Sequence, residues 1–372
     1  MRHTVRLRDG QIGVALVLAA CGRLNFAPID GGDASSGVVI PGAMTVHVSG
    51  YPDSCPTLAW SGTEIGVLYR EQVSTTYNFV FRAYDVAGQQ VFGPFNVATG
   101  VTTPACPALV WAGAQYIAAV PYATTGRREI YITTITSSGV GASTNVTNDT
   151  NESLEPRLVY RNGTVELLWN DVPPNGTFGL RALPLSATGA PLGASIALGG
   201  LATFNQFPNI VATTTGFAAV WIGSTQVRVQ AIDATGSVPG PETIVVPGSS
   251  IGATSTGPDV LAAWSDQSAL TTAIFDSAGT ITSGPFMHPS TVQPARYSIA
   301  WSGADARALY VALSNSQVHL VALAASGDDT NDVTLGPAAS GNTTIPEIVW
   351  AGDRYAAAFH NDGGAWLTLL PP

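Results

Sequence analysis

Lysine is absent from this sequence, so all 15 of its basic residues are arginine. Charge of either sign is scarce: charged residues make up 11% of the 372 residues, and the net charge is −10. Without residues 1–20, 12 basic and 24 acidic residues remain, which gives a net charge of −12. Nucleic acids are bound mainly by Lys and Arg that neutralise phosphates, so we expect this acidic chain to have no nucleic-acid partner.

Long apolar runs are also missing. The run at residues 12–20 has nine residues, whereas a helix needs about 20 to span a bilayer, and no later segment qualifies. Glycine and proline are abundant instead, with 40 and 25 residues, beside a hydrophobic content of 45%. This composition argues against disorder and against a helix-rich protein, and it favours short strands joined by tight turns.

Residues 1–20 have the features of a secretory signal peptide, because three arginines precede a short apolar run and small residues stand before the expected cleavage point. The end of this segment, Leu18-Ala19-Ala20-Cys21, resembles the lipobox of bacterial lipoproteins. The resemblance implies that the Cys21 thiol is acylated and begins the mature chain, and that the lipid is its only contact with the membrane. The alternative is an ordinary secreted protein in which this cysteine occurs by chance.

Residues 21–42 are expected to form the lipidated start and a flexible tether, since residues 30–37 are small and polar. Residue Gly22 stands where an aspartate would signal retention in the inner membrane, so we expect a cell-envelope protein at the outer membrane. The remaining residues, 43–372, are expected to form one domain.

That domain is built from a repeat, whose clearest copies run from a proline through a Trp or Tyr to a glycine at 56–62, 107–113, 156–163 and 346–352. Seven anchor positions (60, 111, 160, 212, 255, 301 and 350) follow one another at intervals of 43 to 52 residues. Nine residues beyond each anchor lies an aromatic residue in six of the seven copies. These markers are expected to form the core between units.

Each unit reads as four short strands, which is typical of a propeller blade. The seventh unit ends after its third strand, and an unpaired strand candidate, residues 44–48, precedes the first unit. The sequence therefore predicts an all-β, seven-bladed propeller closed by its N-terminal strand, with no edge left open. Six or eight blades remain as alternatives if one weak copy is misread.

The units resemble the Trp-and-Gly propeller repeats of secreted and surface proteins of Gram-negative bacteria. The features that carry the resemblance are Trp169-Asn170-Asp171, Trp264-Ser265-Asp266 and Glu129-Ile130-Tyr131. The resemblance covers residues 44–372 and implies a fold, but it implies no activity because one fold hosts many functions. The Trp-Asp dipeptide and the sialidase box of other propeller families are absent.

Motifs for chemistry are weak. The G-x-S-x-G match at residues 248–252 lacks the strand-to-helix context of a nucleophile elbow. The acidic run 328–332 lacks the glycine and distal glutamate of a calcium loop. The four histidines beyond the signal lie in different units without ligand spacing: His47, His288, His319 and His360. We therefore expect no catalytic residue, no metal and no cofactor.

Two cysteines occupy equivalent places in neighbouring units, since Cys55 and Cys106 each directly precede the proline of a repeat. The first strands of adjacent blades lie close together near the axis, and an exported protein meets an oxidising environment. The two cysteines are expected either to form a disulfide with each other or to remain as two buried free thiols. In both cases their role is structural.

The ligand face of a propeller is usually formed by the loops between second and third strands and between blades. The richest of these loops are residues 127–128, 148–155, 170–177 and 204–207. We expect a lipid-anchored binding or scaffold protein that recognises a protein or a glycan with this face. The alternative is a polysaccharide hydrolase or lyase, which requires carboxylates that converge near the ring centre.

Overall fold

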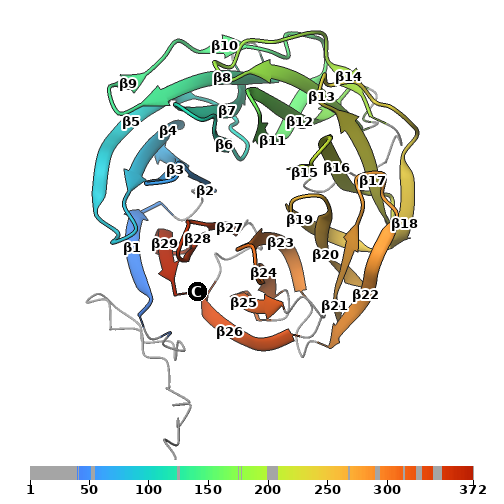
Figure 1. The fold of residues 1–372 in the computed structure, drawn as a ribbon. Helices are drawn as coiled ribbons and strands as arrows, with labels where there is room; N and C mark the ends of the chain where they lie inside the picture. The colour runs from blue at the N-terminus through green and yellow to red at the C-terminus, as the bar shows by residue number, and fades with distance from the viewer. Residues whose placement is uncertain are drawn as a thin grey trace, which may run out of the picture.

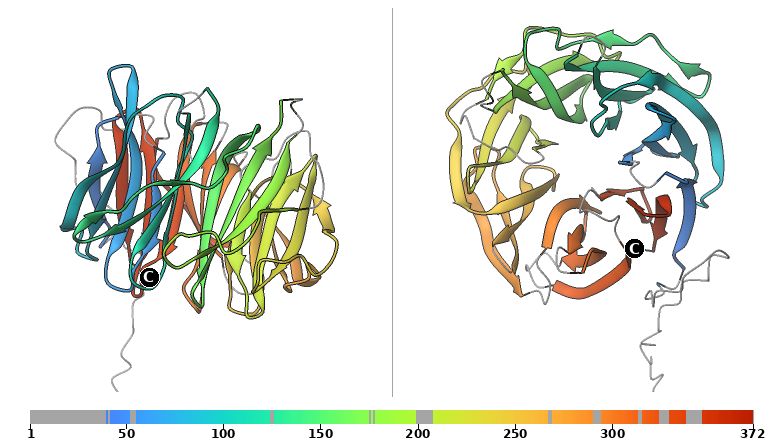
Figure 2. Two further views of the ribbon diagram at one scale, coloured as in Figure 1. Left: turned by 90° about the horizontal axis from the view of Figure 1, so that it is seen from above. Right: turned by 180° about the vertical axis from the view of Figure 1, so that it is seen from behind.

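The computed structural model describes residues 40, 42–51, 55–123, 126–174, 176, 178–198, 208–266, 269–289, 294–312, 315–323, 329–337 and 346–371. Over these ranges the regular elements are all β-strands, arranged as seven sheets around one axis (Figure 1). No helix among the described residues is long and apolar enough to cross a bilayer. Seen from the side, the ring is a short disc (Figure 2).

The first four blades follow the chain from the inner strand to the outer one. Blade one contains β2 (Thr57–Trp60), β3 (Ile65–Val73), β4 (Thr76–Tyr84) and β5 (Gln90–Val101). Blade two contains β6 (Ala108–Trp111), β7 (Tyr116–Ala123) and β8 (Arg128–Thr136), with β9 (Gly139–Val140) and β10 (Thr144–Asn145) both paired to β8. Blade three contains β11 (Glu152–Arg161), β12 (Thr164–Val172), β13 (Gly179–Ser186) and β14 (Ile196–Ala197). Blade four contains β15 (Asn209–Ala212), β16 (Gly216–Gly223), β17 (Gln226–Asp233) and β18 (Thr243–Pro247).

The last three blades repeat this order. Blade five contains β19 (Ser249–Ser255), β20 (Val260–Asp266), β21 (Ala269–Phe275) and β22 (Ile281–Pro289). Blade six contains β23 (Pro294–Trp301), β24 (Ala306–Ala312), β25 (Gln317–Leu323) and β26 (Asp329–Pro337). Blade seven contains β27 (Glu347–Trp350), β28 (Tyr355–Asn361), β29 (Gly364–Leu370) and the N-terminal β1 (Met44–Ser49).

The N-terminal strand closes the ring. Strand β1 pairs antiparallel with β29, with Val46 opposite Leu367, and completes the sheet β1-β29-β28-β27. The seven four-stranded blades and the first-to-last closure predicted from the repeat are therefore confirmed. The closure matters because a strand edge left unpaired at β29 would be open to aggregation.

The aromatic markers nine residues beyond the anchors form the core between blades, as predicted. Trp169, Trp221 and Trp264 are at most 1% exposed, and each packs against the blade that precedes its own. Trp169, for example, lies in one cluster with Ile117 and Ile130 of blade two. The regular marker therefore follows from the ring: each blade packs its marker side chain against the previous blade, and this side chain is aromatic in all blades but the second, which has Val120.

The Asp-x-x-Gly turns between third and fourth strands have the structure that the sequence predicts. The Asp85 carboxylate accepts hydrogen bonds from the N–H groups of Ala87 and Gln89, at 2.9 and 2.8 Å. Gly88 has a φ of +73°, which a residue without a Cβ adopts without strain. The same turn recurs at Asp233 and Asp276.

Candidate functional site

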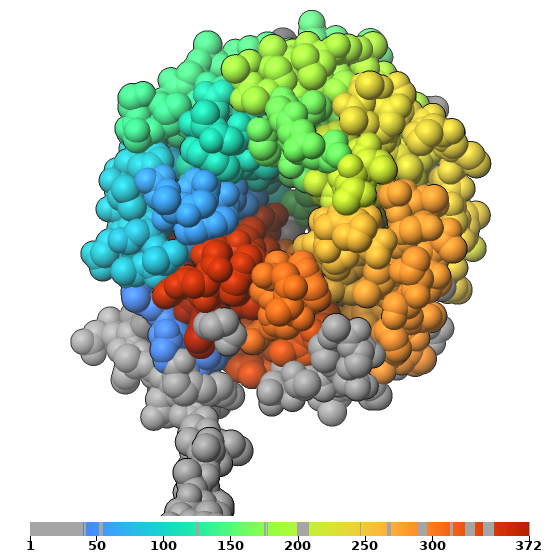
Figure 3. Space-filling model, in the orientation of Figure 1, coloured from blue at the N-terminus to red at the C-terminus, as the bar shows by residue number. Residues whose placement is uncertain are grey.

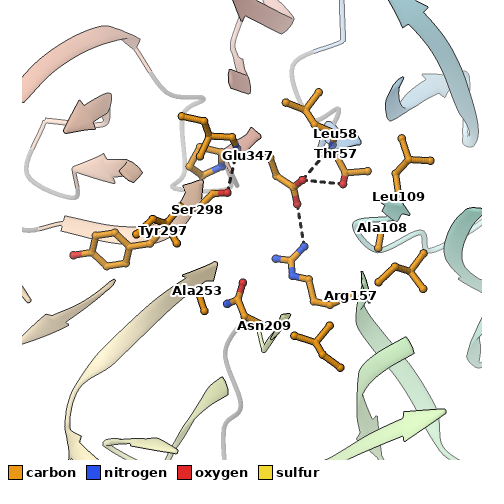
Figure 4. A pocket seen from close by; sticks show the side chains of 15 residues that line it. Thr57, Leu58, Ala108, Leu109, Arg157, Asn209, Ala253, Tyr297, Ser298 and Glu347 are labelled. Atoms are coloured by element: carbon orange, nitrogen blue, oxygen red, sulfur yellow. Dashed lines mark hydrogen bonds and ion pairs between the residues drawn. The ribbon is translucent and has the colours of Figure 1, made fainter. Parts of the chain in front are cut away.

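The ring encloses a small cavity on its axis, of about 190 Å³ (Figure 4). Each blade contributes to it a stretch of its inner strand, and the equivalent position in every blade lies three residues before the repeat anchor. We call these positions the channel ring: Thr57, Ala108, Arg157, Asn209, Gly252, Ser298 and Glu347. Six of the seven line the cavity, and in blade five Ala253 lines it next to Gly252. Figure 3 shows a narrow hollow near the centre of the ring.

An ion pair crosses this channel. The Glu347 carboxylate of blade seven lies 3.2 Å from the Arg157 guanidinium of blade three (Figure 4). Its other oxygen accepts hydrogen bonds from the Thr57 hydroxyl at 2.9 Å and from the Leu58 N–H at 3.2 Å. Both oxygens of Glu347 are thus engaged by blades one and three, and both charged side chains are less than one-fifth exposed.

Other channel-ring side chains bond the backbone of the next blade. Inner strands are sheet edges, so they carry backbone groups that no further strand can pair. Three bonds of this kind join successive blades: Arg157 Nε to Pro208 O at 3.2 Å, Asn209 Nδ2 to Ile251 O at 3.0 Å, and Ile348 N to Ser298 Oγ at 3.1 Å. The polar residues of the channel ring therefore hold the blades together.

Between blades one and two, a disulfide joins the inner ends of the blades instead of such a hydrogen bond. The structure joins Cys55 to Cys106, with Cα atoms 5.5 Å apart. Both residues directly precede the proline of an inner strand, so the bond lies at the end of the ring where the inner strands begin. Cys21, the expected lipidation site, lies outside the described residues.

The same end of the ring carries residues in unusual backbone conformations. Two residues before the channel ring, Cys55, Glu155, Ser250 and Arg296 all have positive φ, between +46° and +54°. A left-handed conformation costs an L-residue about 1–2 kcal/mol, and such strain is often found at functional sites. In blades three, five and six it coincides with a shift in strand register just before the channel ring.

The positive charges of four arginines act on Glu155. Burial raises the pKa of Glu155, and the positive charges of Arg157, Arg70, Arg128 and Arg296 oppose that rise. These arginines come from blades three, one, two and six, so four blades bring positive charge to the end of the ring where Glu155 lies. We call Glu155 and these four arginines the axial mouth.

The partners of these arginines define the charge of the axial mouth. Arg128 Nη2 lies 2.6 Å from a carboxylate oxygen of Glu152, and Arg70 donates to the Pro104 carbonyl at 3.3 Å. Burial lowers the pKa of Arg296, and the negative charge of Glu155 opposes that change.

Three of the four loops expected from the sequence meet beside this mouth. The Arg128–Glu152 pair joins loop 127–128 to loop 148–155. The side-chain amide of Asn151 donates to the Asp171 carboxylate at 2.9 Å, which brings in loop 170–177. Burial raises the pKa of Asp171, and the hydrogen bond from Asn151 opposes that rise. The fourth loop, 204–207, lies outside the described residues.

The other motifs weighed from the sequence stay apart from the mouth or lack the required context. Ser250 belongs to a strand that leads into another strand, so the described chain has no nucleophile elbow there. Asp332, from the acidic run, lies 2.9 Å from Nδ1 of His319. The imidazole of His47 packs against Trp366 at a ring distance of 4.5 Å. Within the described ranges, no three His, Cys, Asp or Glu side chains gather as a metal site.

Comparison with known proteins identifies the fold. No protein family matches the sequence, and no curated protein matches it either. Solved propellers do match in structure. Hydrazine synthase of Kuenenia stuttgartiensis gives a TM-score of 0.56 at 13% identity, over 88% of this chain and 98% of that one. The β-propeller domain of Cps50 from Myceliophteria thermophila gives 0.53 at 12% identity, over 88% and 100%.

A second enzyme is among the similar structures. The α-L-arabinanase of Penicillium chrysogenum, complexed with arabinobiose, gives a TM-score of 0.51 at 12% identity, over 76% of this chain and 99% of that one. At these identities the likeness shows the β-propeller fold alone, because one fold hosts many chemistries.

Proposed function

We propose that this chain is a binding protein whose ligand docks on the axial mouth. The observation that carries the proposal is the axial cavity, to which all seven blades contribute and beside which three of the loops expected from the sequence are joined by side-chain bonds. Holding several desolvated charges together is costly and is a poor way to stabilise a ring. Perturbed ionisable groups gathered in a concave place are a signature of functional sites.

An enzyme that hydrolyses a polysaccharide is the second candidate. Glu155 favours it, because a general acid needs a raised pKa of this kind. Glycoside hydrolysis generally requires a second carboxylate on the other side of the scissile bond. Glu347 is the carboxylate at the channel, but Arg157, Thr57 and Leu58 engage both of its oxygens. Acids do converge near the axis, yet this arrangement suits binding better than catalysis.

The setting of the site is also part of the proposal: a lipid-anchored, outer-membrane protein of the cell envelope that recognises a protein or a glycan. The signal-like residues 1–20 and Cys21 support the anchor, and a Cys55–Cys106 disulfide suits an oxidising compartment. Labelled palmitate should enter the wild-type protein, while the Cys21→Ala variant should stay unlabelled. A labelled variant would refute the lipidation site.

We expect a thermal-shift screen with glycans and cell-wall fragments to give hits that depend on the axial mouth. A ligand at 100 times its Kd stabilises the folded state by about 2.7 kcal/mol. The hit should vanish in an Arg128→Gln, Arg296→Gln double variant. It should persist in Arg307→Gln, because that residue follows the turn at the opposite end of the inner strands. Equal shifts in all three proteins would place the ligand elsewhere.

A further inference from the structure

The repeat anchors form a second surface, at the end of the ring opposite the axial mouth. Each anchor lies at or next to the end of an inner strand, whose earlier residues line the axial cavity. The anchor is aromatic in five blades that follow one another around the axis (Figure 1), and it is Ala212 or Ser255 in the other two. We call these five side chains, from blades six, seven, one, two and three, the aromatic arc: Trp301, Trp350, Trp60, Trp111 and Tyr160.

The arc is more exposed than the aromatic markers nine residues further on. All five of its side chains are half-buried, whereas the indole N–H groups of Trp169 and Trp221 are buried without a hydrogen-bond partner. Within the described residues, the indole N–H groups of the four arc tryptophans form no hydrogen bond, and none of them is a buried polar atom. Each arc tryptophan therefore brings a ring and an unused donor to the surface, which is the usual presentation of tryptophan at a protein interface.

Buried tyrosines hold two of these rings in fixed positions. Trp111 packs edge-on against Tyr116 with ring centroids 4.8 Å apart, and Trp350 packs against Tyr355 in the same way at the same distance. The hydroxyl of each tyrosine donates a 3.0 Å hydrogen bond to a backbone carbonyl in a turn of the preceding blade. Because the rings are held before a partner arrives, a partner that binds them has little side-chain ordering to offset.

The turns beside the arc are acidic. The seven turns between first and second strands contain one arginine, Arg354, and four acids: Glu64, Asp259, Asp305 and Asp353. Two more arginines, Arg161 and Arg307, lie on the strands next to these turns, and three further acids begin the Asp-x-x-Gly turns at the same end. In blades six, seven and one, an arc tryptophan and an acid belong to the same turn. Negative charge therefore exceeds positive charge around the arc.

The chain itself places one guanidinium between a ring and a carboxylate at this end. The Cζ atom of Arg307 lies 5.3 Å from the centroid of the Tyr355 ring, and its Nε atom lies 3.3 Å from a carboxylate oxygen of Asp305. A guanidinium is attracted to the face of an aromatic ring and to a carboxylate at once. Rings and carboxylates that alternate along the arc therefore suit cationic side chains better than a neutral sugar.

We propose that the aromatic arc is a docking surface for a basic protein segment, whose arginine side chains stack on the tryptophans and pair with the acids of the turns. The side chains of Asp305 and Asp353 are 41% and 63% exposed, so each can accept a further cation. An acidic partner would be repelled by the same charges. This surface lies at the other end of the ring from the axial mouth, so the inference goes beyond the proposed function and gives the protein two binding faces.

Fluorescence anisotropy with a labelled peptide of alternating arginine and serine tests the inference, with a glutamate–serine peptide of equal length and the neutral sugar cellohexaose as comparison probes. The wild type should bind the arginine peptide alone. Trp60→Leu and Trp350→Leu should each weaken that binding about fivefold, the loss expected from one cation–π contact. Trp366→Leu is the matched control and should bind as the wild type does, because the Trp366 N–H is bonded to Asn361 Oδ1 outside the arc.

A second variant tests the charges without touching a ring. The double variant Glu64→Gln, Asp353→Asn changes two turn side chains, and it should weaken binding severalfold at low salt. The difference from the wild type should shrink as salt is added, because exposed charges are screened. The mouth variant Arg128→Gln, Arg296→Gln should bind the arginine peptide like the wild type, which separates this surface from the proposed function.

Four results would overturn the inference. The first is failure of the arginine peptide to bind a wild type that melts cooperatively. The second is equal binding of the arginine and glutamate peptides. The third is equal binding by the three tryptophan variants, or, if the arc variants do not fold, binding that the double variant Glu64→Gln, Asp353→Asn leaves unchanged. The fourth is binding of cellohexaose, lost in Trp60→Leu, without binding of the peptide, which would make the arc a sugar platform.

Discussion

Replacing Glu166 with glutamine is expected to abolish a fall in stability that the wild-type protein shows between about pH 4.5 and about pH 8. Glu166 lies in β12, is fully buried, and has no hydrogen-bond partner for either carboxyl oxygen among the described residues. Burial raises its pKa from 4.5 to about 8, and the negative charge of Asp233 adds to the rise.

The sign of the effect follows from proton binding. Below pH 4.5 the folded and unfolded chains both hold the Glu166 proton, so the group adds no dependence on pH. Between 4.5 and about 8 the folded chain holds a proton that the unfolded chain has lost. Stability then falls by up to about 1.4 kcal/mol for each pH unit. Above the folded pKa the loss is complete.

Thermal melts of the wild type, Glu166→Gln and the control Glu64→Gln across this pH range provide the measurement. Glu64 belongs to the turn after β2 and lies partly in solvent. The Glu166→Gln melting temperature should exceed that of the wild type most clearly at the alkaline end, and Glu64→Gln should follow the wild type. A wild-type curve no steeper than that of Glu166→Gln would contradict the account of this buried acid.

The second large effect is expected at the channel, where Glu347→Ala should destabilise the fold by about 3–5 kcal/mol, the usual cost of leaving one member of a buried ion pair alone. The substitution removes the counter-charge of Arg157 and the acceptor of the Thr57 and Leu58 hydrogen bonds. The loss should be larger than for Glu347→Gln, because glutamine keeps an acceptor oxygen.

Urea unfolding of the single variants and of the double variant Arg157→Met, Glu347→Ala would isolate the interaction. The double variant should be more stable than the sum of the single losses allows, since no charge is then left unpaired. Asp353→Asn, which breaks an exposed pair with Arg354, should leave the midpoint unchanged and serves as the control. Additive losses would mean that the pair does not couple blade three to blade seven.

The fold could be predicted from the sequence because its signals are periodic. An aromatic marker such as Trp169 or Trp221 returns in six of the seven blades, and the ring closure follows from one missing strand and one spare strand. The outer strand of blade two was harder to predict, because two short strands, β9 and β10, take its place. Strands of two residues carry no pattern that a sequence can show.

The site was predictable only in part. Arg157 and Glu347 directly follow a repeat proline, and equivalent positions of a ring meet at its axis, so repeat register alone could have paired them. We used that argument for Cys55 and Cys106 and missed it for the charged residues. Arg70 lies at no such register position, and only the folded ring brings it to the mouth.

A crystal structure of the protein bound to a hit from the glycan screen tests the central claim most directly, because it shows where a ligand lies. The account predicts ligand density at the end of the channel that holds the axial mouth, in contact with Arg128 or Arg296. Density on the outer strands or at the opposite end of the ring would contradict it.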